Sequence, residues 1–107
     1  MIENQIYKRY DNIHWVSYHG DVYSDVIKRD MKHYITIDGH HRVDIHGRHR
    51  FVHHLVYECW IGPIPPNMQI NLYNDDKDNN NADNLYAGTQ KENVRDCIAN
   101  NHRKGHL

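Results

Sequence analysis

The sequence predicts an α+β fold: an N-terminal antiparallel β-sheet, then a short helix, then a strand–loop–strand–helix unit. Three observations favour this class. Apolar and polar residues alternate over 34–52, as they do in half-buried strands. The apolar period changes to that of a helix over 52–60. Two strand-like segments then bracket a loop rich in Asn and Asp, and a helix-start signal follows them.

Length and composition are typical of one small intracellular domain. The chain has 107 residues, 38% of them hydrophobic, which is enough for a single thin core spanning 1–107. No apolar run is long enough to cross a membrane, and the N-terminus lacks the apolar core of a signal peptide, so we expect a cytoplasmic protein. Cys59 and Cys97 stand far apart, which argues against a disulfide framework or a four-thiolate zinc site; each is expected to be a small buried residue.

The N-terminal part, residues 1–51, is predicted to be β-rich. Two short β-prone runs flank a His-Gly-Asp turn within 7–27. Further on, Asp38-Gly39 and His46-Gly47 supply turns at hairpin spacing. The alternating apolar residues of this second part are Ile35, Ile37, Val43 and Ile45. We therefore expect a sheet with one buried face and one face that carries His and Arg.

The remaining elements follow from a change of period and from stop signals. Residues 52–66 comprise a short amphipathic helix, whose apolar face is Val52, Leu55, Val56, Cys59 and Trp60, and a proline-rich connector that ends it. Residues 67–100 read as a strand, a polar loop, a second strand and a helix, with a Thr89/Glu92 capping box at the helix start and Val94, Cys97 and Ile98 on its apolar face. Residues 101–107 form a basic tail.

In this order, four segments resemble those of the phage and intron HNH endonucleases, which include homing endonucleases. The segments are "VSYHGDVYS", "VHHLVYECWIGPIPPNMQIN", "DDKDNNNADNL" and "TQKEN". The resemblance covers most of the chain. It implies that residues 67–100 form a ββα-metal motif, which grips one divalent ion and hydrolyses DNA.

The resemblance also implies a role for each motif residue. Asn71 and Asn93 match the two metal ligands, and Asn84 matches the Asn that braces the loop and orients the base. The position of the general-base His is occupied by Leu72. A leucine has no lone pair and cannot take a proton from water, so the chain is expected to be inactive or impaired.

The implied ligands and partner follow from the same comparison. Amide oxygens suit Mg²⁺ or Mn²⁺ better than Zn²⁺, so no structural zinc is expected, and Asp75 or Asp76 is a possible additional ligand. Double-stranded DNA is the expected partner, bound mainly through phosphate, and a homodimer is possible. Formal net charge is −1, which weakens the case for DNA, but His and Arg gather in the middle of the chain. The expected DNA-binding residues are His41, Arg42, Arg48, Arg50, His54 and Lys77.

Several alternatives remain open on the sequence. The chain is a natural or deliberate variant of an HNH endonuclease, or it is a non-catalytic descendant that binds DNA or a protein. A His-rich metal-binding domain ranks last, because no His pair forms a closed zinc pattern with Cys. His53 is expected to be a hydrogen-bonded structural residue. We do not expect His49, His53 or His54 to replace the missing base, because they belong to the preceding sheet and helix.

Overall fold

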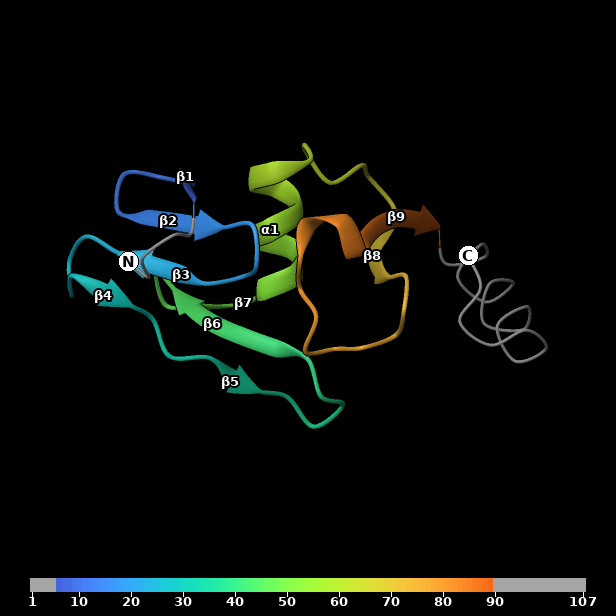
Figure 1. Cartoon of the computed structure of the whole chain (residues 1–107), viewed down its shortest axis with the longest axis horizontal. Helices are drawn as coiled ribbons and strands as arrows, with labels where there is room; N and C mark the ends of the chain where they lie inside the picture. The colour runs from blue at the N-terminus through green and yellow to red at the C-terminus, as the bar shows by residue number, and fades with distance from the viewer. Residues whose placement is uncertain (1–5, 90–107) are drawn as a thin grey trace.

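The computed structural model describes residues 6–89, and its elements form three small antiparallel sheets around one helix (Figure 1). The first sheet contains β1 (Tyr7–Arg9), β2 (His14–Ser17), β3 (Val22–Ser24) and β4 (Arg29–Asp30), paired in chain order. The second contains β5 (Tyr34–Ile35), β6 (His41–Ile45) and β7 (Arg48–Phe51). Helix α1 (Val52–Trp60) follows β7 directly. A hairpin of β8 (Met68–Leu72) and β9 (Leu85–Thr89) comes last, with a short 3-10 helix, η1 (Ala82–Asn84), just before β9.

These elements confirm the predicted α+β class, with a helix at 52–60 between β-rich parts. The N-terminal part differs from the prediction, because it forms two sheets rather than one. The predicted final helix, with Asn93 and Cys97, lies outside the described residues. None of the helices that the structure describes is long and apolar enough to cross a membrane.

Helix α1 lies at the centre of the molecule, and its apolar face joins all three sheets (Figure 1). Val52, Leu55 and Val56 are completely buried, as the helical spacing predicted. Cys59 and Trp60 are only partly buried, and the Trp60 indole donates a hydrogen bond to the Val16 carbonyl at 3.0 Å. The core cluster consists of Val16, Val22, Val43, Ile45, Val52, Leu55, Val56, Ile70, Leu72, Ala82 and Leu85.

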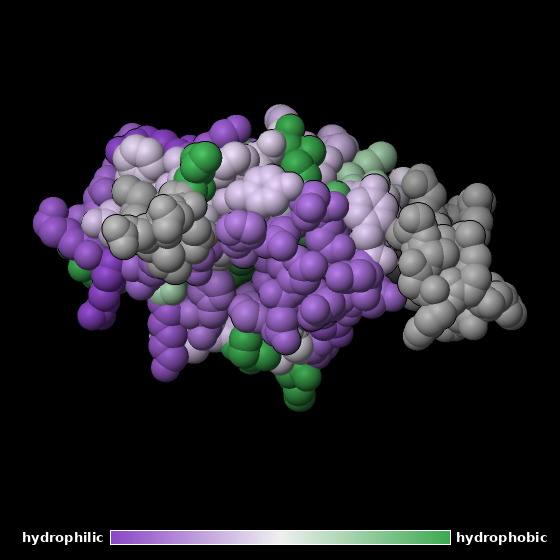
Figure 2. Space-filling model, viewed as in Figure 1, coloured by the Kyte–Doolittle hydropathy of each residue, from purple (hydrophilic) through white to green (hydrophobic). Residues whose placement is uncertain are grey.

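The alternation that predicted the second sheet is correct for only half of its residues. Val43 and Ile45 are buried, whereas Ile35 is 59% exposed and Ile37 is fully exposed. The reason for Ile35 is geometric: β5 is a two-residue edge strand that pairs with only the start of β6, so within residues 6–89 its side chain is little covered, and Ile37 lies beyond β5 in the following turn. The exposed hydrophobic side chains are separate green patches on a mainly hydrophilic surface (Figure 2).

Gly20 marks the point where the first sheet approaches both the helix and the polar loop. Its φ is +101°, a left-handed conformation that side chains rarely adopt. A Cβ there would lie 3.0 Å from Val52 Cγ1 and 3.1 Å from Asn80 Cβ. The predicted His-Gly-Asp turn is therefore also the contact that holds the first sheet against α1 and against the loop between β8 and β9.

Candidate active site

The polar loop of residues 73–84 is a folded element with its own internal bonding. Asn84 is buried, and its side-chain NH₂ donates to Asn74 Oδ1 and to the Asn79 carbonyl, both at 2.9 Å. Its side-chain oxygen accepts the Asn74 backbone N–H at 3.2 Å. One buried amide thus joins both ends of the loop, since Asn74 and Asn79 both bond to it. Asp76 adds a further turn by accepting the Asp78 backbone N–H at 3.0 Å.

The loop is also tied to both N-terminal sheets. The Ala82 N–H donates to the Tyr18 carbonyl at 3.0 Å, beside the Gly20 turn. On the other side, His41 Nε2 lies 2.7 Å from Asp78 Oδ1, and the Lys77 ammonium donates to the Asp38 carbonyl. A freely solvated linker would have none of these anchors, so the loop is a built part of the fold.

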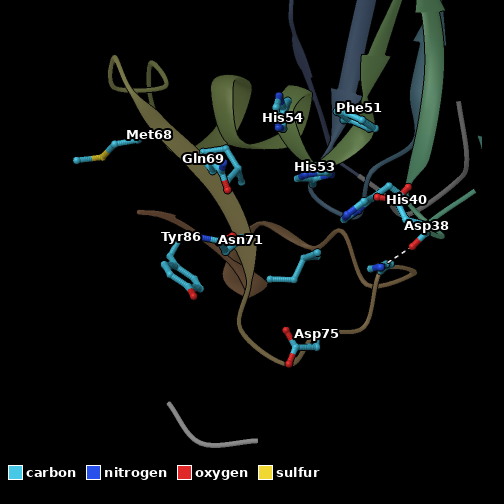
Figure 3. A pocket seen from close by; sticks show the side chains of 13 residues that line it. Asp38, His40, Phe51, His53, His54, Met68, Gln69, Asn71, Asp75 and Tyr86 are labelled. Carbon is cyan, nitrogen blue, oxygen red and sulfur yellow. Dashed lines mark hydrogen bonds between the residues drawn. The ribbon is translucent and has the colours of Figure 1, made fainter. Parts of the chain in front are cut away.

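A cavity of about 770 Å³ lies where the β8–β9 hairpin meets the second sheet and the start of α1 (Figure 3). Two of the sequence-predicted site residues, Asn71 and Leu72, are consecutive at the end of β8 and line it. Two of the predicted DNA-binding residues, His54 and Lys77, line it as well. The other lining residues are Asp38, His40, Phe51, His53, Met68, Gln69, Ile70, Asp75 and Tyr86.

Asn71 and Leu72 have different environments, because successive side chains of a strand point to opposite faces. Leu72 is only 8% exposed and belongs to the core, opposite Leu85 in the strand pair. Asn71 is half-buried opposite Tyr86, and Figure 3 shows their side chains near each other. Leu72 also lines the cavity, so a histidine at position 72 would replace an apolar core contact at the cavity wall, and the expectation that β8 tolerates histidine there stays a prediction.

Three histidines line the same cavity from the N-terminal half and from the helix. The rings of His40 and His53 stack with centroids 4.7 Å apart, and His54 lies edge-on to His53 at 4.6 Å. Nδ1 of His40 and Nδ1 of His53 are both buried without a hydrogen-bond partner. His53 was expected to be a hydrogen-bonded structural residue; it is buried, at 4% exposure, but its Nδ1 has no hydrogen-bond partner among the described residues.

Burial disfavours the charged form of these histidines. It lowers the pKa of His53 to about 3, with further lowering from the nearby His54 and His40 rings. Burial also lowers the pKa of His40 and of His54. For His40 and His54 the lowered pKa disfavours the charged form. His40 was not singled out from the sequence; its position just after the Asp38-Gly39 turn was the available signal.

The cavity wall around Asn71 carries side-chain oxygen atoms that could act as metal ligands. Gln69 and Tyr86 line the cavity, and Asp75 projects from the loop below Asn71 (Figure 3). Amide, phenol and carboxylate oxygens are the ligand type that a hard ion such as Mg²⁺ or Mn²⁺ takes. The described part of the site fits such an ion, with Asn71 as the sequence-predicted ligand; the second, Asn93, lies outside the described residues.

The remaining predicted DNA-binding residues do not share one face of the second sheet. Strand pairing sets Arg50 opposite Val43 and Arg48 opposite Ile45, so both arginines are on the face that also bears the buried residues. Arg42 is on the other face, with an ion contact of 3.4 Å to Asp44 that lacks hydrogen-bond geometry. The expectation of a single His/Arg face opposite a buried face is therefore wrong.

Two of these residues are also engaged within the fold. Arg50 donates to Glu58 at 2.7 Å and to the Tyr10 hydroxyl at 2.9 Å, which ties β7 to α1 and to the first sheet. His41 lies between His33, at 3.0 Å, and Asp78. Arg48, in contrast, is exposed.

Comparison with known proteins identifies the region around the cavity. Residues 50–95 match the HNH endonuclease family. The chain is 33% identical over 96 residues to the DNA endonuclease I-HmuI of Bacillus phage SP01. A solved structure described as DNA binding and cleavage by the HNH homing endonuclease I-HmuI superimposes with a TM-score of 0.77 at 31% identity. Both matches cover 86% of this chain and 55% of the relative, so the chain spans about half the length of the protein it resembles.

The matched residues include β8, the Asn/Asp loop and β9, which are the elements that form the wall of the cavity carrying Asn71 and Leu72. The sequence resemblance, the family match and the structural similarity all agree on this region. The chain is therefore homologous to an HNH endonuclease, and the part that matches the HNH family is residues 50–95.

Proposed function

We propose that this chain is an HNH-type DNA endonuclease unit, built to nick or cleave double-stranded DNA by divalent-metal-dependent hydrolysis and impaired by Leu72 at the position of the general base. The observation that carries the proposal is the pair Asn71–Leu72 at the end of β8, inside the family-matched region and on the wall of the cavity. We further propose that it acts in the cytoplasm of the host cell, and that a homodimer is the form that would give paired cuts.

The proposed ion is Mg²⁺ or Mn²⁺, which would be held by Asn71 and Asn93 and would neutralise charge on the phosphate and on the leaving oxygen. The chain's own residues supply the rest. Asn84 keeps the loop closed against the cavity through its three hydrogen bonds. Lys77 and His54 both line the cavity, which supports assigning them to contacts with DNA phosphates.

The step that the chain lacks is proton removal from the attacking water. Leu72 cannot accept a proton, and a replacement base must be a group whose pKa lies near the working pH. His53 has a pKa of about 3, so it is too weak a base for this role. His49 is paired with Asp44 at 2.6 Å and does not line the cavity. These observations argue against His53 and His49 as the replacement base, which supports an impaired nuclease.

The second candidate is a non-catalytic HNH-like module that binds DNA or a protein. Leu72 also favours this candidate, because its side chain packs in the core and so contributes to the fold instead of to catalysis. The two candidates separate when duplex DNA binding and plasmid nicking are measured on the same preparation with Mg²⁺, with Mn²⁺ and with a chelator. Slow nicking that the chelator abolishes supports the nuclease. DNA or protein binding without any metal-dependent nicking supports the module, and the absence of DNA binding at low salt contradicts the proposed DNA partner.

A further inference from the structure

A second cluster with metal-ligand chemistry lies away from the cavity, between two hairpin turns. It consists of Asp11, His14 and His46, whose ligand atoms all lie within 4.8 Å of one another. Asp11 precedes β2 and His14 begins it, whereas His46 lies in the turn between β6 and β7. None of the three lines the cavity that contains Asn71 and Leu72. The cluster therefore joins the two N-terminal sheets at a place that the proposed nuclease chemistry does not use.

The backbone holds each of these side chains in place. The Asp11 carboxylate accepts the backbone N–H groups of Ile13 at 2.9 Å and of His14 at 2.8 Å. His14 is 5% exposed and has little freedom to turn away. His46 has a φ of +53° and Gly47 a φ of +77°, which is the conformation of a tight type I′ hairpin turn. Asn is the residue usually preferred at the first of these positions, and His is among the residues that also adopt it.

The distances suit a small tetrahedral ion. His14 Nδ1 is 2.9 Å from Asp11 Oδ1, and His46 Nε2 is 3.2 Å from Asp11 Oδ2. A tetrahedral zinc ion with nitrogen and oxygen ligands at about 2.0–2.2 Å separates those ligands by about 3.3–3.5 Å. An outward shift of a few tenths of an ångström, chiefly by the exposed His46 side chain, would admit the ion. The exposure of His46 also leaves a fourth position open to water.

We propose that Asp11, His14 and His46 bind one Zn²⁺-class ion that staples the turn before β2 to the β6–β7 turn. Two imidazoles and one carboxylate are a donor set that favours Zn²⁺, or Co²⁺ as its spectroscopic substitute, over Mg²⁺. Without the ion the same atoms are held together by hydrogen bonds to Asp11, so the fold forms in either state. This site is independent of the ion proposed at Asn71, and it revises the sequence-based expectation of no zinc.

The test compares two single variants of the β6–β7 hairpin after removal of metal by a chelator. His46→Asn removes one ligand but keeps a residue that tolerates the left-handed turn, so the hairpin should still form. His49→Asn, an exposed histidine of the same hairpin outside the cluster, is the matched control. Binding is measured by competition for Zn²⁺ with a chromophoric chelator and by the visible absorption of Co²⁺. The melting temperature is followed with Zn²⁺ and with Mg²⁺.

The unmodified chain and His49→Asn should each take up one tightly bound Zn²⁺, give a tetrahedral Co²⁺ spectrum and melt at a higher temperature with Zn²⁺ but not with Mg²⁺. His46→Asn should bind Zn²⁺ at least about tenfold more weakly, lose the Co²⁺ spectrum and melt without metal at the same temperature as the parent. Absence of Zn²⁺ uptake by the unmodified chain overturns the proposal. So does equal binding by the two variants, since weak surface histidine sites would then account for the uptake.

Discussion

The β8–β9 hairpin and the β5–β7 sheet are both small antiparallel units beside α1. They differ in how strongly strand pairing fixes the position of each side chain. In the hairpin, five consecutive residue pairs fix the register from Met68 and Thr89 to Leu72 and Leu85, and the loop is closed internally by Asn84. In the sheet, β5 contributes only two residues and leaves Ile35 exposed. Local strand pairing therefore fixes the side-chain positions of the hairpin, whereas the burial of β5 residues depends on which other elements pack against them.

This difference teaches where a motif has predictive power. Residues of the hairpin are fixed both by strand pairing and by side-chain hydrogen bonds, and the roles that the resemblance implies for them stay predictions. Charged residues of the sheet do not form the expected surface, because each was assigned to a face from composition rather than from pairing. Arg50, for example, lies opposite Val43 and bonds to Glu58.

The first prediction concerns the hairpin and restores a general base at position 72. We expect Leu72→His to raise metal-dependent plasmid nicking by about 10²–10⁴-fold over the chain as written, which is the usual contribution of general-base catalysis. Because Leu72 is in the core, the variant should also lose about 1–3 kcal/mol of stability. Nicking is therefore measured at a temperature where circular dichroism shows the variant to be folded.

Leu72→Gln is the matched control, since it brings a polar side chain into the same position without an imidazole. It should be destabilised in a similar way but should stay inactive. If Leu72→Gln or the unmodified chain nicks as fast as Leu72→His, another group removes the proton and the assignment of position 72 is wrong. If Leu72→His is folded, binds DNA and remains inert, the non-catalytic function is the correct one.

The internal closure of the loop gives the second prediction. Asn84→Ala removes three hydrogen bonds and leaves the Asn74 N–H and the Asn79 carbonyl without their partner, so we expect a loss of about 2–3 kcal/mol in the free energy of unfolding. The exposed Asn12→Ala should change it by less than about 0.5 kcal/mol. Urea denaturation of both variants measures the difference. Equal stabilities would show that the loop does not depend on its buried amide.

The buried histidines beside the hairpin give the third prediction, a fall in stability on mild acidification. The pKa of His53 is about 3 in the folded chain and about 6.5 when unfolded, so below pH 6.5 only the unfolded chain gains this proton. The stabilising effect of a neutral His53 is complete above pH 6.5 and is lost progressively as pH falls toward 3. Between pH 7 and pH 5 the free energy of unfolding should fall by at most about 2 kcal/mol from this residue.

Urea denaturation at several pH values between 5 and 7 measures this slope. His53→Leu should flatten it, whatever the variant does to stability at pH 7, and the exposed His19→Gln should leave the slope close to that of the parent. The Asp11 carboxyl does not interfere in this range. Burial acts to raise its pKa, but hydrogen bonds from Ile13, His14 and His46 outweigh it and hold the pKa at about 2. An unchanged slope in His53→Leu would mean that His53 is protonated in the folded state.

The fold and the cavity were predictable to different depths. Helix 52–60 and the strands at β8 and β9 follow from periodicity and turn signals, and Asn71, Leu72 and Asn84 follow from the resemblance. The histidines of the cavity could not be assigned, because His40 approaches His53 through tertiary packing that no local pattern encodes. The cluster of Asp11, His14 and His46 was missed for the same reason, since its members come from two hairpins far apart in sequence.

The smallest expected effect concerns which charges contact DNA. Lys77 lines the cavity, and its ammonium donates to the Asp38 carbonyl. Lys32, near β4, lies over the Tyr34 ring and does not line the cavity. We expect Lys77→Ala to weaken duplex binding about fivefold at moderate salt and to reduce the slope of log affinity against log salt by about one, the effect of one lost phosphate contact. Lys32→Ala should leave both quantities unchanged.

Fluorescence anisotropy of a labelled duplex at four salt concentrations provides both numbers. Equal losses in the two variants would mean that DNA is attracted by overall charge rather than by the cavity side of the hairpin. A loss confined to Lys32→Ala would show that DNA binds to the first two sheets. The β8–β9 hairpin would then have a nuclease-like fold but would not contact DNA through Lys77.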